Sequence, residues 1–98
     1  MRLARDIRQN FRMSAITPSQ VKATIELGIP NSIVQITDLT GTQDHYQAVV
    51  VAEQFIGKSL VQQHQLVNGA VKEALASGAI HALALKTYTP DAWNSANQ

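Results

Sequence analysis

The chain has 98 residues, no cysteine and a formal net charge of +1. This length fits one small domain, and the lack of cysteine excludes disulfides, zinc ribbons and a cluster held by the chain's own thiolates. A net charge near zero predicts weak long-range attraction to nucleic acid or anionic lipid. No apolar run reaches the length of a membrane span, so we expect a cytoplasmic protein without a membrane partner.

Residues 1–16 are predicted to be a basic N-terminal extension, followed by the domain at 17–98. The extension interleaves four arginines with three apolar residues at helical spacing: Arg2, Arg5, Arg8 and Arg12, with Leu3, Ile7 and Phe11. Such a segment can contact membrane or nucleic acid, or serve as a transit peptide. It carries Asp6 and lacks a small-residue cleavage site. Because chain termini are commonly disordered, we expect a frayed or loosely docked extension.

The first helix is predicted to begin at residues 17–20, which combine an N-cap threonine, a proline at the first helical position and a capping-box glutamine. It ends at Gly28, a residue typical of helix C-termini. Two strands rich in β-branched residues follow at 33–38 and 45–52. The short loop between them contains a glycine and predicts an antiparallel hairpin.

A long helix is predicted over 59–76, followed by a third strand at 80–88 and a short last helix that carries Trp93. The apolar stripe of the long helix consists of Leu60, Val67, Val71, Ala74 and Leu75. Strand two, helix and strand three form a crossover, so strand three should run parallel to strand two with a right-handed connection. The order αββαβα predicts an α+β fold, a two-layer sandwich with a mixed three-stranded sheet.

Two of the three histidines lie at strand ends. His45 opens the second strand and His81 opens the third. Because these strands run parallel, the two imidazoles would meet at one edge of the sheet if the strands are neighbours. Neutral imidazoles are suitable ligands for zinc, copper or iron. Two ligands do not close a site, so others must come from elsewhere; a strand-end histidine without a function is the alternative for His81.

Other combinations of reactive residues give weaker signals. His64 lies on the apolar stripe, where we expect a buried, hydrogen-bonded structural residue. Ser59 is five residues from His64, so the two point to different helix faces, and no acid is placed to orient the base. Gly57-Lys58-Ser59 resembles the end of a phosphate-binding loop, but Ala52 stands where its first glycine would be. We therefore do not expect an enzyme.

Three separated motifs occur in the second half of the chain. They are Phe55-x-Gly57-x-Ser59-x-Val61-x-x-His64-x-x-Val67, then Ile80-His81-Ala82-Leu83, then Thr87-x-Thr89-Pro90-x-x-Trp93. Together they resemble the BolA family, over about residues 17–93. The resemblance implies an αββαβ fold of the class II KH type, which agrees with the order derived from the pattern.

The resemblance to the BolA family also implies a function. BolA-like proteins pair with monothiol glutaredoxins of the Cys-Gly-Phe-Ser kind and share a [2Fe-2S] cluster with them, in iron–sulfur trafficking or iron and redox regulation. It implies that His81 is a metal ligand and that the loop before the second strand supplies another. His45 is the only imidazole there, and Asp44 is an alternative oxygen ligand or a partner to an imidazole N–H. A glutaredoxin cysteine and glutathione would complete the site. Alone, the domain would hold no cofactor and be a monomer or weak homodimer.

The family resemblance implies a second function, transcriptional regulation through DNA binding. Lys58, Lys72 and Lys86 are the candidate phosphate contacts. The run at 62–65 carries no charge, and the Gly-x-x-Gly clamp of KH proteins is absent. We therefore expect the glutaredoxin function ahead of the DNA function. Gly57 and Trp93 are expected to be structural, with Trp93 as a lid on the core between sheet and helices.

Overall fold

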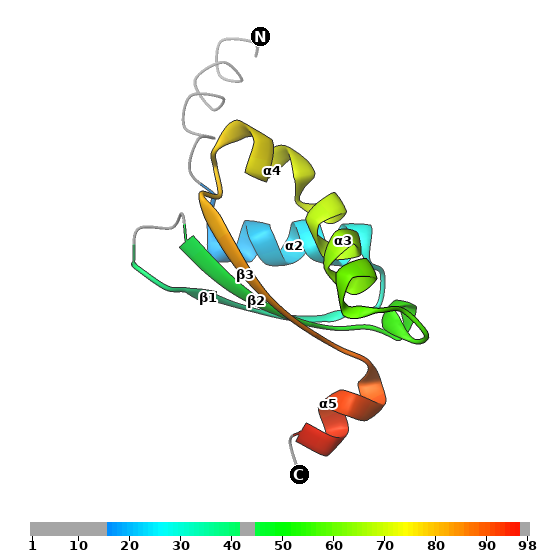
Figure 1. The fold of residues 1–98 in the computed structure, drawn as a ribbon. Coiled ribbons are helices and arrows are strands. Elements are labelled where there is room, and N and C mark those ends of the chain that lie inside the picture. The colour runs from blue at the N-terminus through cyan, green and yellow to red at the C-terminus, as the bar shows by residue number, and fades with distance from the viewer. Residues whose placement is uncertain (1–15, 42–44, 97–98) are drawn as a thin grey trace, which may run out of the picture.

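A computed structural model describes residues 16–41 and 45–96, which form a three-stranded sheet with all helices but the last on one side (Figure 1). The elements in chain order are α2 (Pro18–Gly28), β1 (Ile33–Asp38), β2 (His45–Val51), the 3-10 helix η1 (Glu53–Phe55), α3 (Leu60–Ala70), α4 (Lys72–Ser77), β3 (Ala82–Tyr88) and α5 (Pro90–Ala96). The predicted α+β order is confirmed. The arginines of the N-terminal extension and Asp44 lie outside the described residues. Within the described part of the chain, no helix is long and apolar enough to cross a membrane.

The strand β2 lies in the centre of the sheet. On one side β1 runs antiparallel to it, with Ile33 opposite Val51. On the other side β3 runs parallel, from Ala82 beside His45 to Tyr88 beside Val51. The crossover through α3 and α4 therefore returns next to β2, as predicted, and the N-terminal ends of β2 and β3 share one edge of the sheet.

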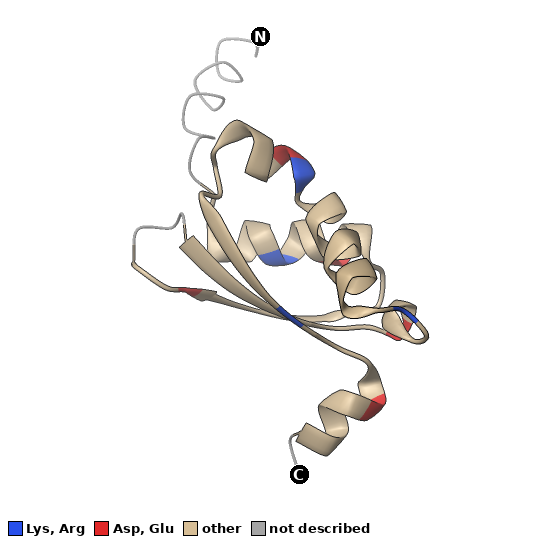
Figure 2. Ribbon diagram, in the orientation of Figure 1, with Lys and Arg blue, Asp and Glu red and all other residues tan. Residues whose placement is uncertain are grey.

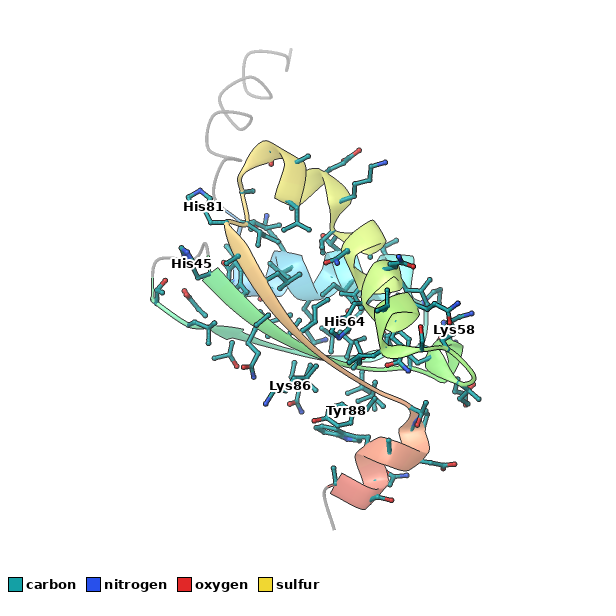
Figure 3. The ribbon with its side chains drawn as sticks, viewed as in Figure 1. His45, Lys58, His64, His81, Lys86 and Tyr88 are labelled. Atoms are coloured by element: carbon teal, nitrogen blue, oxygen red, sulfur yellow. The ribbon has the colours of Figure 1, made fainter. Side chains whose placement is uncertain are left out.

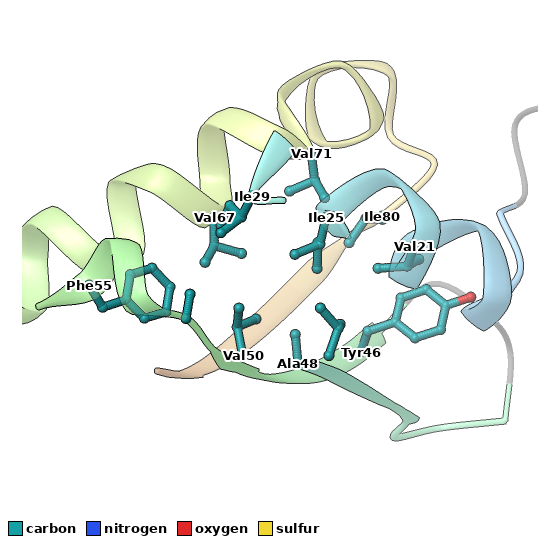
Figure 4. Close-up of a cluster of buried hydrophobic side chains, with 12 residues drawn as sticks. Val21, Ile25, Ile29, Tyr46, Ala48, Val50, Phe55, Val67, Val71 and Ile80 are labelled. Atoms are coloured by element: carbon teal, nitrogen blue, oxygen red, sulfur yellow. The ribbon is translucent and has the colours of Figure 1, made fainter. Parts of the chain in front are cut away.

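The hydrophobic core fills the space between the sheet and the helices α2 and α3 (Figure 4). Its buried members are Val21, Ile25, Ile29, Val34, Tyr46, Ala48, Val50, Ala52, Phe55, Val67, Val71 and Ile80. Side chains alternate across a strand, so Tyr46, Ala48 and Val50 share the face of β2 that the helices cover. The Tyr46 hydroxyl donates a hydrogen bond to the carbonyl of Ile16, so burying this ring leaves its polar atom paired.

The helix α2 begins and ends where the sequence predicts. The amide of Gln20 donates to Thr17 Oγ1 at 3.2 Å and the amide of Thr17 donates to Gln20 Oε1 at 2.9 Å, which completes the capping box. Gly28 serves a different purpose from the predicted stop signal. It is still helical, and a Cβ atom added there would lie 2.6 Å from the Cβ of Ala70. The missing side chain therefore lets α2 approach α3 closely.

The long helix predicted over 59–76 is broken at Val71. This residue has φ −109° and ψ 18° and separates α3 from α4, although its N–H still bonds to the carbonyl of Val67. Gly69, two residues before it, lowers the local helix preference, because glycine costs about 1 kcal/mol relative to alanine in a helix. The break keeps the side chain of Val71 in the core. Leu60 does not reach the core and is 61% exposed.

The last helix α5 projects from the end of β3, on the side of the sheet away from α2 and α3 (Figure 1). Trp93 is half-buried and contacts Tyr88 edge to face, with ring centroids 5.2 Å apart. It does not belong to the core cluster, so the predicted lid position is wrong. The alternation of side chains along β3 explains this position. Tyr88 points to the uncovered face, like Ala84 and Lys86, and α5 starts two residues later, so Trp93 meets Tyr88 on that face.

Candidate histidine site at the sheet edge

The imidazoles of His45 and His81 lie side by side, as the predicted topology requires (Figure 3). Their ring centroids are 5.8 Å apart, and the ring planes make an angle of 84°. His45 is half-buried and His81 is exposed. The parallel register places His45 beside Ala82, the residue directly after His81, which explains the approach.

The backbone around His45 is held by the hairpin. The amide of Leu39 donates to the carbonyl of His45 at 2.8 Å and closes the end of the strand pair. On the other strand, the carboxylate of Asp38 accepts from the amides of Thr40 at 3.3 Å and Gly41 at 3.0 Å. Sequence reasoning missed this role of Asp38, although an Asp followed by Thr and Gly is a signal for a side chain that orders a turn.

The backbone around His81 is anchored by its preceding residue. Ile80 is 1% exposed in the core, and its amide donates to the carbonyl of Ala74 at 3.1 Å. Gly78 ends α4 in the left-handed conformation, with φ 84°, and turns the chain toward the sheet. An exposed imidazole therefore follows directly after a fully packed residue, which fixes its backbone without covering its ring.

The spacing of the pair is close to that of two imidazole ligands on one metal ion. An imidazole nitrogen binds a tetrahedral ion such as zinc at about 2.0–2.1 Å, so the centroids of two such rings lie roughly 5 Å apart. The observed distance of 5.8 Å is somewhat longer than this. Among residues 16–41 and 45–96, no group of three or more histidine, cysteine or acidic residues is placed to hold a metal ion. The described part of the chain thus places two imidazoles, and no third such group, at this edge.

The remaining predicted residues lie elsewhere. His64 is on α3, away from the other two histidines (Figure 3), and is half-buried rather than buried as expected. Gly57 has φ 80° in the turn between η1 and α3, a conformation that favours glycine, and a Cβ there would meet nothing within 4 Å.

The three candidate lysines come from separate elements and do not form one patch (Figure 2). Lys58 lies in the turn before α3, Lys72 is the first residue of α4 next to Glu73, and Lys86 lies in the middle of β3. All three are exposed. Each can contact a phosphate by itself, but their placement does not define a single track for a nucleic-acid backbone.

The chain folds as a small α+β domain with two neighbouring histidines, one exposed and one half-buried, at an edge of its sheet. The family model described as "BolA-like protein" matches residues 14–92. The chain therefore belongs to the BolA family.

Individual relatives agree with this assignment. Protein RP812 of Rickettsia prowazekii is 38% identical over 73 residues, which is 74% of this chain and 94% of that protein. A Vibrio cholerae protein named DNA-binding transcriptional regulator BolA is 43% identical over 58 residues, 59% of this chain and 54% of that protein. A BolA homologue from Coxiella burnetii has a solved structure that superposes with a TM-score of 0.70 at 38% identity, covering 81% of this chain and 97% of that one.

Proposed function

We propose that this protein is a partner of a monothiol glutaredoxin and shares a [2Fe-2S] cluster with it, with His81 and His45 as the ligands from this chain. The observation that carries the proposal is the pair of imidazoles 5.8 Å apart at an exposed edge of the sheet. The motif around His81, through which the chain resembles the BolA family, supplies the kind of partner.

The ligand chemistry supports a shared site rather than a closed one. Two imidazole nitrogens are half of the four protein-side ligands that such a cluster takes, and the chain has no thiolate. A glutaredoxin cysteine and the thiol of glutathione supply the other half. When bound, the cluster would have two histidines on one iron, which raises its reduction potential relative to an all-cysteine cluster.

The placement of the two histidines suits a site formed between two proteins. His81 is exposed on a fixed backbone, so a partner can approach it without unfolding any part of the core. Binding requires the neutral imidazole, so acid should release the cluster. A protein that supplies two of four ligands can pass a cluster on or report its presence, which are the tasks of iron–sulfur trafficking and of iron or redox regulation.

Anaerobic reconstitution with a monothiol glutaredoxin, iron, sulfide and glutathione tests the proposal. The two proteins should co-purify with a cluster whose visible circular dichroism differs from that of the glutaredoxin homodimer. The His81→Ala variant should lose this difference. The His64→Ala variant is the matched control and should keep it, because His64 lies on α3 away from the site. An unchanged spectrum with His81→Ala would show that His81 is not a ligand.

DNA binding is the second candidate, favoured by the printed name of the Vibrio cholerae relative. It predicts sequence-selective binding that survives moderate salt. A gel-shift titration at several salt concentrations distinguishes this from simple phosphate attraction, which falls steeply with salt and equally for all sequences. Deletion of residues 2–12 separates the contribution of the basic extension from that of the domain.

A further inference from the structure

A groove lies at the end of the sheet opposite the histidine pair. Its larger part has a volume of about 490 Å³, and its walls include Ile33, Val51, Pro90 and Trp93. A second hollow of about 300 Å³ adjoins it, and both are lined by Asn31 and Glu53. The larger part falls within the size range of ligand sites.

The walls of this groove combine an apolar floor, an aromatic ring and one carboxylate. Ile33 is 53% exposed and Val51 only 3%, so the floor is apolar and partly open. Trp93 is half-buried, with its ring held against Tyr88. Among the described residues that line the two hollows, Glu53 is the only charged one.

The carboxylate of Glu53 is available to a ligand. Glu53 is exposed, and the one ion pair found among the described residues joins Lys22 and Glu26 on α2. An aromatic ring attracts a cation placed over its face, and a carboxylate binds guanidinium or ammonium through charge-assisted hydrogen bonds. The two side chains on one groove therefore complement a positive charge carried on an apolar stem.

We propose that this groove binds a basic side chain of a partner polypeptide. The carboxylate of Glu53 would pair with the positive charge, and the ring of Trp93 would pack against the same basic group. Arginine fits best, because its planar guanidinium stacks on aromatic rings and pairs with a carboxylate through two parallel donors. An anionic occupant would face Glu53 with no lining cation to offset it. A purely apolar occupant would cover the groove without pairing this carboxylate, which costs free energy.

The asparagines that line the groove favour a polypeptide over a free amine as its occupant. Asn31 and Asn94 stand beside Glu53 in the larger hollow, and each side-chain amide has both donors and acceptors for a peptide backbone. The second hollow extends the groove past Glu53 toward Pro30 and Gln54, so residues on either side of the basic one have space.

The chain carries its own reporter for this test, because Trp93 is its only tryptophan. We would titrate the full-length protein, without iron or glutaredoxin, with the blocked peptide Ala-Leu-Arg-Leu-Ala into the millimolar range and follow tryptophan fluorescence. We expect a saturable change. The uncharged peptide Ala-Leu-Gln-Leu-Ala should bind at least about five-fold more weakly, the sum expected for one exposed ion pair and one cation–π contact.

The variant Glu53→Gln should weaken the arginine peptide by about two- to five-fold, because it removes the ion pair and leaves the cation–π contact with Trp93. The variant Glu73→Gln removes the same charge from α4, outside both hollows, and should bind like the original protein. Amide shifts in a two-dimensional NMR titration should centre on Asn31, Glu53 and Asn94. The proposal would be overturned if the two peptides bind equally or if Glu53→Gln binds the arginine peptide as well as the original protein does. Amide shifts centred elsewhere would also overturn it.

Discussion

The two faces of the sheet differ in what their side chains do. On the face covered by α2 and α3, Val34, Tyr46, Ala48 and Val50 are all buried (Figure 4). On the open face, most side chains of β1 and β3 are exposed, and an aromatic pair covers one end only. Alternate side chains of the same strands point to opposite faces, so most of those on one face are buried and most of those on the other are exposed. The covered face provides stability, whereas the candidate binding residues His45, His81, Lys86 and Trp93 lie at an edge or on the open face.

The largest loss of stability is expected for Phe55→Ala. Phe55 is fully buried in the core cluster between η1 and the helices, and removing a buried phenylalanine costs about 3–5 kcal/mol. Urea unfolding followed by far-UV circular dichroism measures this as a lower midpoint with an unchanged slope. A loss below about 1 kcal/mol would show that this part of the covered face is not close-packed.

A second prediction concerns the approach of α2 to α3 above the covered face. Gly28→Ala should destabilise the protein by about 1–3 kcal/mol, as overpacking does, because the new Cβ would lie 2.6 Å from the Cβ of Ala70. Gly69→Ala is the matched control. Gly69 is also helical but has open space around it, so this change should stabilise the protein by up to about 1 kcal/mol. If both substitutions change the free energy of unfolding in the same direction, the packing explanation is contradicted.

The open face should respond much less than the covered face to loss of an aromatic ring. Trp93→Ala removes a half-buried side chain and its contact with Tyr88, and such a pair contributes about 0.5–1.5 kcal/mol beyond burial. We expect a loss somewhat above this range, because the partial burial of the ring is lost as well, but below that of Phe55→Ala, measured by the same urea titration. An equal loss would mean that α5 and the open face belong to the cooperative core.

Much of the fold follows from local patterns in the sequence. Capping at Thr17 set the start of α2, and the β-branched runs located the strands. The short hairpin and the crossover rule gave the antiparallel and parallel pairings. Because two parallel neighbours start at the same edge, His45 and His81 could be brought together without a structure. Their role as ligands stays a prediction.

Other features depend on packing between distant residues and left no local signal. The side of the sheet that Trp93 takes depends on the direction of Tyr88, which a capping motif does not encode. The closeness of Gly28 to Ala70 joins residues from two helices. The groove at Glu53 is assembled from the turn before β1, the ends of β1 and β2, η1 and α5, so its members are scattered along the chain.

The smallest effect on stability is expected at the histidine edge, where the effect on function should be largest. His81 is exposed and precedes a well-anchored strand, and surface substitutions of this kind rarely change stability measurably. His81→Ala should therefore unfold at the urea concentration of the original protein and yet fail to form the mixed cluster with glutaredoxin. If both properties are lost together, the imidazole supports the fold, and the failure of cluster formation says nothing about ligation. If neither is lost, His81 is an ordinary strand-end residue. Unchanged stability together with lost cluster formation is therefore the one result that supports a functional role for His81. It would also show that the histidine edge adds little to a fold stabilised by the covered face of the sheet.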